Sequence, residues 1–129
     1  MNVDTIKENL KRGTIDLLIL SLLQESDKYG YQLRRELVER SSNKYDLKEA
    51  TMYPTLYRLV DYGFLQDSEV RVGKRRTRIY YQLTDKGSEY LQELLKEYLT
   101  MTEAIKHVLN YEETASSEEE NNSRDEAAE

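Results

Sequence analysis

The chain has 129 residues, of which 38% are hydrophobic and 34% charged, and it contains no cysteine. A chain of this length fills one modest core, has no run of about 18 apolar residues that could cross a membrane, and lacks the thiols needed for disulfides or thiolate chemistry. Its N-terminal sequence mixes both charges where a signal peptide would need an apolar stretch, so we expect a cytoplasmic protein with no membrane partner.

Charge is segregated along the chain. The net charge is −6, but the segment from residue 112 to the end carries eight acids and one base, which leaves 18 bases and 17 acids in the first 111 residues. Five of the eight residues in RVGKRRTR, positions 71–78, are basic and none is acidic. We therefore expect a cationic surface that attracts a polyanion, and an acidic, disordered tail at 112–129.

Two helices are predicted in the first 40 residues. Positions 14–23, TIDLLILSLL, are apolar almost all round a helical wheel, so this helix should be covered on two sides, one of them supplied by a partner chain. A turn at ESDKYG follows, and then Tyr29, Leu33 and Leu37 recur at helical spacing in a second, amphipathic helix over 29–40.

A third helix is predicted over EATMYPTLYRL, which contains the only proline of the chain. It should end near Asp61, with Gly63 in the left-handed cap conformation. If Thr51 is the N-cap, Pro54 occupies an early position whose N–H has no helical partner; if the helix begins nearer Lys48, one hydrogen bond is lost. Both alternatives leave the proline near the N-terminal end of the helix.

After Gly63 the hydrophobic period changes from 3.6 to 2. Positions 65–72 and 78–83 are predicted to pair as an antiparallel hairpin with VGKRRT at its tip. Thr84 should cap a long last helix, in which apolar residues are spaced alternately three and four apart. This spacing is typical of a helix that packs against another helix. The apolar positions are Leu91, Leu94, Tyr98, Met101, Ile105 and Val108.

This order of elements predicts a mainly α (α+β) fold, a winged helix-turn-helix with a two-stranded wing and a long C-terminal dimerisation helix. The expected domains are a DNA-binding domain at 1–83, the dimerisation helix at 84–111 and the tail. In such a module the third helix enters the major groove and the wing follows the phosphates. The candidate DNA-binding residues are Lys48, Thr51, Tyr53, Pro54, Tyr57, Arg58, Arg71, Lys74, Arg75, Arg76, Arg78 and Tyr80.

Four linked motifs resemble the PadR family of bacterial transcriptional regulators. They are LKRGTIDLLILSLL, YGYQL, EATMYPTLYRLVDYGFL and KRRTRIYYQLTDKG, which together span roughly residues 10 to 90. The resemblance implies a winged-helix dimer in which the last helix of each chain packs on the first helix of the other, in the manner of the compact subgroup with a single last helix. Lys48 departs from the family, where small polar caps are common at this place. The expected dimer interface comprises Leu18, Leu22, Leu91, Leu94, Leu95, Tyr98, Met101, Ile105 and Val108.

Some residues allow two interpretations. Tyr98 is explained by simple helix packing, or, by analogy with multidrug-sensing relatives, by a cavity between subunits that stacks a flat ligand. The candidate ligand-binding residues are Ile15, Asp16, Glu97, Tyr98 and Met101. Tyr29, Tyr62 and Tyr81 are expected to be structural. His107 is the only histidine, so no metal site is expected, and no cofactor is implied.

The function that we expect is a homodimeric repressor, not an enzyme, that binds double-stranded DNA at an inverted-repeat operator in a promoter and is released by a small planar inducer. The alternative is a winged-helix adaptor that binds an acidic protein without specific DNA recognition. No phosphate loop, nucleophile–base pair or paired carboxylates favour an enzyme.

Overall fold

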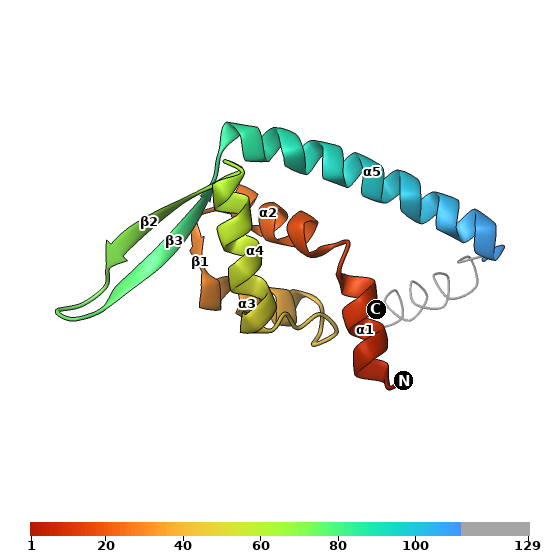
Figure 1. Cartoon of the computed structure of the whole chain (residues 1–129), viewed down its shortest axis with the longest axis horizontal. Coiled ribbons are helices and arrows are strands. Elements are labelled where there is room, and N and C mark those ends of the chain that lie inside the picture. Colours follow the sequence, from red (N-terminus) through yellow and green to blue (C-terminus); the bar gives the residue numbers. More distant parts are fainter. Residues whose placement is uncertain (112–129) are drawn as a thin grey trace, which may run out of the picture. The chain divides into compact units, whose positions relative to one another are not determined.

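The computed structural model describes residues 1–111, and the acidic tail expected at 112–129 lies outside the described residues. The first compact unit ends at Leu95, within the last helix, and a second unit begins at Lys96. The described chain combines helices with one antiparallel sheet (Figure 1). The elements are α1 (Val3–Lys11), α2 (Ile15–Glu25), β1 (Lys28–Tyr29), α3 (Gly30–Arg40), α4 (Glu49–Asp61), β2 (Leu65–Arg71), β3 (Thr77–Leu83) and α5 (Asp85–Leu109).

The core of the first unit is built from the apolar faces of α2, α3 and α4, and is closed by Tyr81 of β3 and Leu91 of α5. Six of the eleven residues of α2 are buried, including Leu22, and Leu18 is half-buried. The chain itself therefore covers more of α2 than we expected. Its largest fully buried side chains are Ile19, Leu20, Leu33, Leu47, Met52, Leu56, Leu59 and Tyr81.

The start of α4 decides between the two alternatives for Pro54. Lys48 is the N-cap residue, in extended conformation and without a side-chain cap hydrogen bond. Its carbonyl accepts from the backbone N–H groups of Thr51 and Met52, at 3.0 and 2.9 Å. The helix therefore begins at Glu49, so that Thr51 as N-cap is wrong, and Pro54 is a residue inside the helix that cannot donate to the fourth residue before it.

The other end of α4 follows the prediction. Gly63 has a φ of +81°, the left-handed conformation, and donates its N–H to the carbonyl of Val60 at 2.9 Å. The N–H of Phe64 donates to the carbonyl of Leu59 at 3.0 Å. These two bonds form a Schellman cap, which ends the helix and turns the chain into β2.

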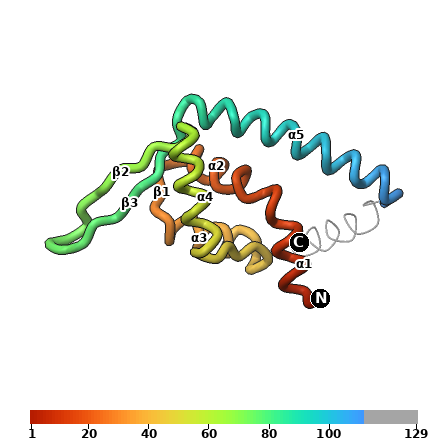
Figure 2. Tube along the Cα trace, viewed as in Figure 1, coloured from red at the N-terminus to blue at the C-terminus, as the bar shows by residue number. Residues whose placement is uncertain are grey.

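The sheet has the order β1-β3-β2 and is antiparallel, as the neighbouring strands in Figure 2 show. The hairpin register runs from Leu65 opposite Leu83 to Arg71 opposite Thr77. Tyr81 is buried as the alternation predicted, but Ile79 is 41% exposed because the hairpin extends beyond the helices that cover its base (Figure 1). The two-residue β1 was not predicted, since a strand this short has no period to detect.

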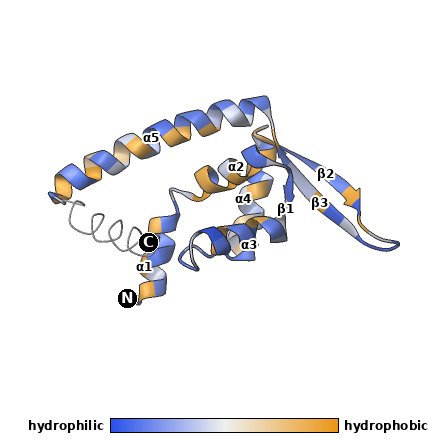
Figure 3. Cartoon of the chain, turned by 180° about the vertical axis from the view of Figure 1, so that it is seen from behind, coloured by the Kyte–Doolittle hydropathy of each residue, from blue (hydrophilic) through white to orange (hydrophobic). Residues whose placement is uncertain are grey.

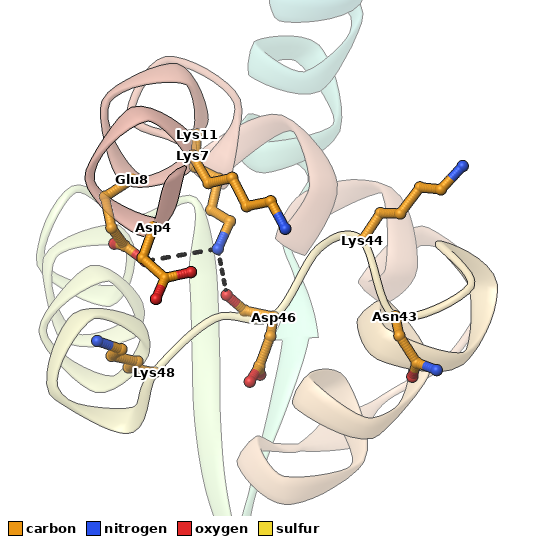
Figure 4. Close-up of a pocket in the computed structure, with 8 residues that line it drawn as sticks. All are labelled: Asp4, Lys7, Glu8, Lys11, Asn43, Lys44, Asp46 and Lys48. Carbon is orange, nitrogen blue, oxygen red and sulfur yellow. Dashed lines mark hydrogen bonds and ion pairs between the residues drawn. The ribbon is translucent and has the colours of Figure 1, made fainter. Parts of the chain in front are cut away.

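The N-terminal helix α1 was not predicted either. Asn2 caps it by accepting from the N–H of Thr5 at 2.9 Å, and none of its residues is buried. Its last residue, Lys11, donates to the carbonyl of Asp46 at 2.7 Å (Figure 4). The helix thus supports the loop that leads into α4.

Thr84 caps α5 as expected, because its hydroxyl accepts from the N–H of Gly87 at 3.0 Å. The start of α5 lies against the end of α4, where Phe64 stacks on Tyr90 with the ring centroids 4.2 Å apart. In the second unit the described part of α5 carries exposed apolar side chains, and Figure 3 shows hydrophobic patches along the helix. Within residues 1–111, no helix is long and apolar enough to cross a membrane.

Candidate nucleic-acid interface

Five cations project from the wing, the hairpin of β2 and β3 with its connecting loop at 72–76. The loop is closed by a hydrogen bond from the N–H of Val72 to the carbonyl of Arg76, at 3.0 Å, and Arg71 donates to the carbonyl of Lys74 at 3.0 Å. Within the described part of the chain, no carboxylate forms an ion pair with any of the five. Their charge is therefore available to an external anion. The five wing cations are Arg71, Lys74, Arg75, Arg76 and Arg78.

A groove lined by tyrosines lies between the wing, the start of α3 and the middle of α4. It encloses about 310 Å³ and is lined by Tyr29, Gly30, Tyr31, Tyr53, Tyr57, Asp67, Thr77, Arg78, Ile79 and Tyr81. Residues from five different elements meet here, which no local sequence pattern could reveal. We call it the tyrosine groove.

The floor of the tyrosine groove depends on one glycine. Tyr53 is half-buried and lies so close to Gly30 that a Cβ at that position would be 2.6 Å from the Tyr53 hydroxyl. Burial raises the pKa of Tyr53, and burial raises the pKa of Tyr81 to about 12. Both phenols are therefore neutral at physiological pH and can donate hydrogen bonds.

The predicted residues of α4 divide into two groups. The N-cap residue Lys48 and the helical residues Pro54 and Tyr57 are exposed, whereas Thr51 and Tyr53 are half-buried. Thr51 uses its carbonyl to accept from the hydroxyl of Thr55 at 2.9 Å. The exposed Ala50, which the sequence did not single out, lies in the first turn with them.

Arg58 and Asp16, expected at two different sites, form an ion pair. The guanidinium of Arg58 lies 2.5 Å from Asp16, and the hydroxyl of Tyr90 donates to the same carboxylate at 3.3 Å. This network joins α4, α2 and α5 within the first unit. The pair partly neutralises both side chains, so Arg58 attracts a phosphate less strongly, and Asp16 a cationic ligand less strongly, than an unpaired group would.

The loop before α4 is held by charged groups from both sides. Besides accepting from Lys11, Asp46 accepts at its carboxylate from Nε of Arg34 at 3.0 Å, and this bond lowers the pKa of Asp46. A hollow of about 280 Å³ between this loop and α1 is lined by both acids and lysines (Figure 4). No group of three or more potential metal ligands occurs anywhere in residues 1–111.

The structure distributes the expected interface residues unevenly. Leu22 and Leu91 are buried in the core of the first unit and offer little area to a partner, and Leu18 and Leu94 are half-buried. The remaining five are exposed: Leu95, Tyr98, Met101, Ile105 and Val108. Of the candidate ligand residues, Ile15 is buried in the first unit, and Glu97, Tyr98 and Met101 are exposed in the second.

Tyr80 and Tyr29 belong to the same aromatic cluster at the base of the wing. Their ring centroids are 5.5 Å apart, and the guanidinium of Arg78 lies over the Tyr29 ring at 4.3 Å from its centroid. Tyr29, assigned only a structural role from the sequence, is thus in direct contact with a wing cation.

Comparisons with known proteins agree with this geometry. Residues 19–93 match the model of the transcriptional regulator PadR-like family. An uncharacterised protein of Lysinibacillus sphaericus is 36% identical over 107 residues, which cover 78% of this chain and 92% of that protein. The negative transcriptional regulator PadR of Bacillus subtilis is 28% identical over 88 residues, 68% of this chain but only 48% of that protein.

Solved structures show the same fold. A PadR family transcriptional regulator from Eggerthella lenta has a TM-score of 0.75 at 29% identity, covering 85% of this chain and 94% of that one. The structure of Bacillus subtilis PadR in complex with operator DNA has a TM-score of 0.60 at 28% identity, covering 64% of this chain and 45% of that one. The family is one of transcriptional regulators and not of enzymes, and its winged-helix fold is the one described above. The chain belongs to the PadR-like family of transcriptional regulators.

Proposed function

We propose that this chain is a homodimeric repressor that binds an inverted-repeat operator at a promoter. The observation that carries the proposal is the tyrosine groove, which has Tyr53 and Tyr57 of α4 on one side and the wing cation Arg78, without a described carboxylate partner, on the other. A recognition helix needs exposed side chains that reach base edges, and a wing needs cations that contact phosphates. Both are present beside the tyrosine groove. The operator complex of the Bacillus subtilis relative supports DNA as the partner.

The surface of α5 supports dimerisation. Tyr98, Met101 and Ile105 are 43%, 59% and 50% exposed and lie at alternating spacings of three and four, so a second helix would bury them together. We call α4 together with the wing the DNA-binding head. Two DNA-binding heads about 34 Å apart would reach successive major grooves, so the two half-sites of the operator would be one helical turn apart.

Repression and its release complete the proposal. A dimer seated on a promoter excludes polymerase, and the name of the Bacillus subtilis relative as a negative regulator supports this sign. A small planar ligand would stack on Tyr98, and Glu97 would attract a cationic group of that ligand. If the ligand bound more tightly to a subunit arrangement that does not fit the operator, it would release the dimer from DNA.

The test is a salt series on DNA from upstream of the chain's own gene, with binding measured by fluorescence anisotropy and the site located by footprinting. If the dimer neutralises about six phosphates, the logarithm of the association constant should fall with the logarithm of salt at a slope near −5. The triple variant Lys74→Gln, Arg75→Gln, Arg76→Gln should flatten this slope, while Lys96→Gln on α5 should not change it. A wild-type slope near zero would contradict DNA binding and favour the protein-adaptor alternative.

A further inference from the structure

The strand β1 carries two side chains with opposite surroundings. Lys28 is only 3% exposed, and its ammonium group lies 3.1 Å from Glu36 and 3.4 Å from Glu25. Tyr29, the next residue, points to the other face of the sheet, as alternation requires. The ion pairs of the buried Lys28 therefore fix the position from which the Tyr29 ring projects.

The Tyr29 ring meets the wing at two residues. Tyr29 pairs with Tyr80 in the sheet register, and Arg78, two positions before Tyr80 on β3, is its diagonal neighbour on the same face. The Tyr80 ring packs edge-on against Tyr29, with interplanar angle 62°, and Arg78 lies over the ring. A guanidinium within 6 Å of a ring centroid is held by the ring quadrupole, and Arg78 is well inside this limit.

Arg78 differs from the other four wing cations in two respects. It is half-buried, whereas the others are exposed, and it lines the tyrosine groove together with Tyr53 and Tyr57 of α4. An arginine stacked by its face keeps the N–H groups at its edge free for bidentate bonding to a phosphate. Because the ring already restricts the side chain, less conformational entropy is lost when the phosphate binds.

We propose that Tyr29 is a positioning residue for DNA binding, which holds Arg78 at the edge of the tyrosine groove so that it takes one backbone phosphate there. This inference rests on the DNA binding proposed above. Asp67 also lines the groove and repels an anion, so the phosphate sits at the Arg78 end. The phenol hydroxyls of Tyr53 and Tyr57 are the further donors that the groove offers.

A double-mutant cycle tests the proposal on the full chain, with the same upstream DNA and anisotropy salt series. Arg78→Ala should weaken binding at least tenfold and reduce the magnitude of the salt slope by about 2, one phosphate for each subunit of a dimer. Tyr29→Leu should weaken binding by a smaller factor, and adding it to Arg78→Ala should change the affinity less than twofold. Tyr29→Phe, which keeps the ring, should restore wild-type affinity.

The matched control is Arg75→Ala, a wing cation that has no aromatic ring partner in the described part of the chain. Tyr29→Leu should weaken this variant by the same factor as it weakens wild type. Thermal melting followed by circular dichroism shows whether each variant is folded. If Tyr29→Leu does not fold, the affinity of Tyr29→Phe is compared with that of Arg78→Ala instead. An affinity of Tyr29→Phe as low as that of Arg78→Ala would then overturn the role of the ring.

Two other outcomes overturn the inference while leaving the proposed function intact. If wild type binds with a steep salt slope but Tyr29→Leu weakens wild type and Arg78→Ala equally, Tyr29 acts independently of Arg78. If Arg78→Ala keeps the full slope, Arg78 takes no phosphate. A wild-type protein that does not bind DNA overturns both proposals at once.

Discussion

Glu25 and Arg40 show how a single pair of side chains responds to pH. The guanidinium of Arg40 donates to both oxygens of Glu25, at 2.7 and 2.5 Å, and these bonds lower the pKa of Glu25 from its ordinary 4.5 to about 2. Lys28 contributes a further bond to the same carboxylate. Glu25 thus connects the end of α2 with α3 and with the strand that carries Tyr29.

The pKa of Glu25 predicts a pH-dependent stability. Because its pKa is lower in the folded chain, the ionised carboxylate stabilises the fold above pH 4.5, and this contribution is lost as the pH falls towards 2. The melting temperature of wild type should exceed that of Glu25→Gln by a constant amount at neutral pH, and the two should converge between these values. Glu69→Gln, at an exposed hairpin position, is the control and should parallel wild type. A difference that persists unchanged at pH 2 would contradict the assignment.

At the scale of elements, α4, β2 and α5 meet in a closely packed junction. The Schellman cap at Gly63 brings Phe64 against the first turn of α5, where Thr84 also donates its hydroxyl to the carbonyl of Gly63 at 2.7 Å. A Cβ on Gly87 would be 2.0 Å from the carbonyl oxygen of Phe64 and 2.8 Å from Cδ1 of Leu83. No side chain larger than hydrogen fits unless the backbone moves.

The variant Gly87→Ala should therefore destabilise the first unit even though alanine favours helices. Overpacking of this kind costs about 1–3 kcal/mol, more than the roughly 1 kcal/mol that alanine gains over glycine in a helix. Urea denaturation followed by circular dichroism measures the change in the free energy of unfolding. Gly13→Ala is the control, because a Cβ there has nothing within 4 Å, and it should be nearly neutral. Equal stability of the two variants would show that α5 can shift without cost.

At the scale of the whole molecule, the proposed function needs two chains. The exposed apolar residues Tyr98, Met101 and Ile105 of α5, which we call the seam, lie in the second unit. The DNA-binding head and the tyrosine groove lie in the first unit. A single DNA-binding head contacts one half-site, so tight binding to an inverted repeat needs two joined chains. Affinity for the operator therefore depends on the seam as well as on the wing.

Charging the seam should separate the chains. Met101→Glu and Ile105→Glu place carboxylates where apolar side chains would be buried between helices, and both positions are at least half exposed within the chain, so folding should be retained. Light scattering after gel filtration at micromolar concentration should give a dimer for wild type and a monomer for the variants, which should also lose operator affinity. Thr100→Glu, on the exposed opposite side of α5, should stay dimeric. A monomeric wild-type protein under these conditions would contradict the proposed homodimer.

The elements that the sequence predicted correctly are those whose signals are local. The period change after Gly63, the cap at Thr84 and the run of bases at 71–78 each lie within a few residues, and all three recur in the structure. The start of α4 was open between two alternatives, because Lys48 is not a residue type that marks a cap. A short β1 and the surface helix α1 bury too little to leave a pattern.

The sequence by itself determined the winged-helix order, the cationic wing and the apolar seam, because hydrophobic periodicity and charge are properties of the chain read in order. Only the tertiary structure decided that Asp16 pairs with Arg58 and that α2 is covered largely by its own chain. It also decided that the guanidinium of Arg78 lies over the Tyr29 ring at the tyrosine groove. Asp16 and Arg58 are more than 40 positions apart in the chain, as are Tyr29 and Arg78, and no spacing rule along the chain relates such residues. Packing of the helices against the sheet brings them together.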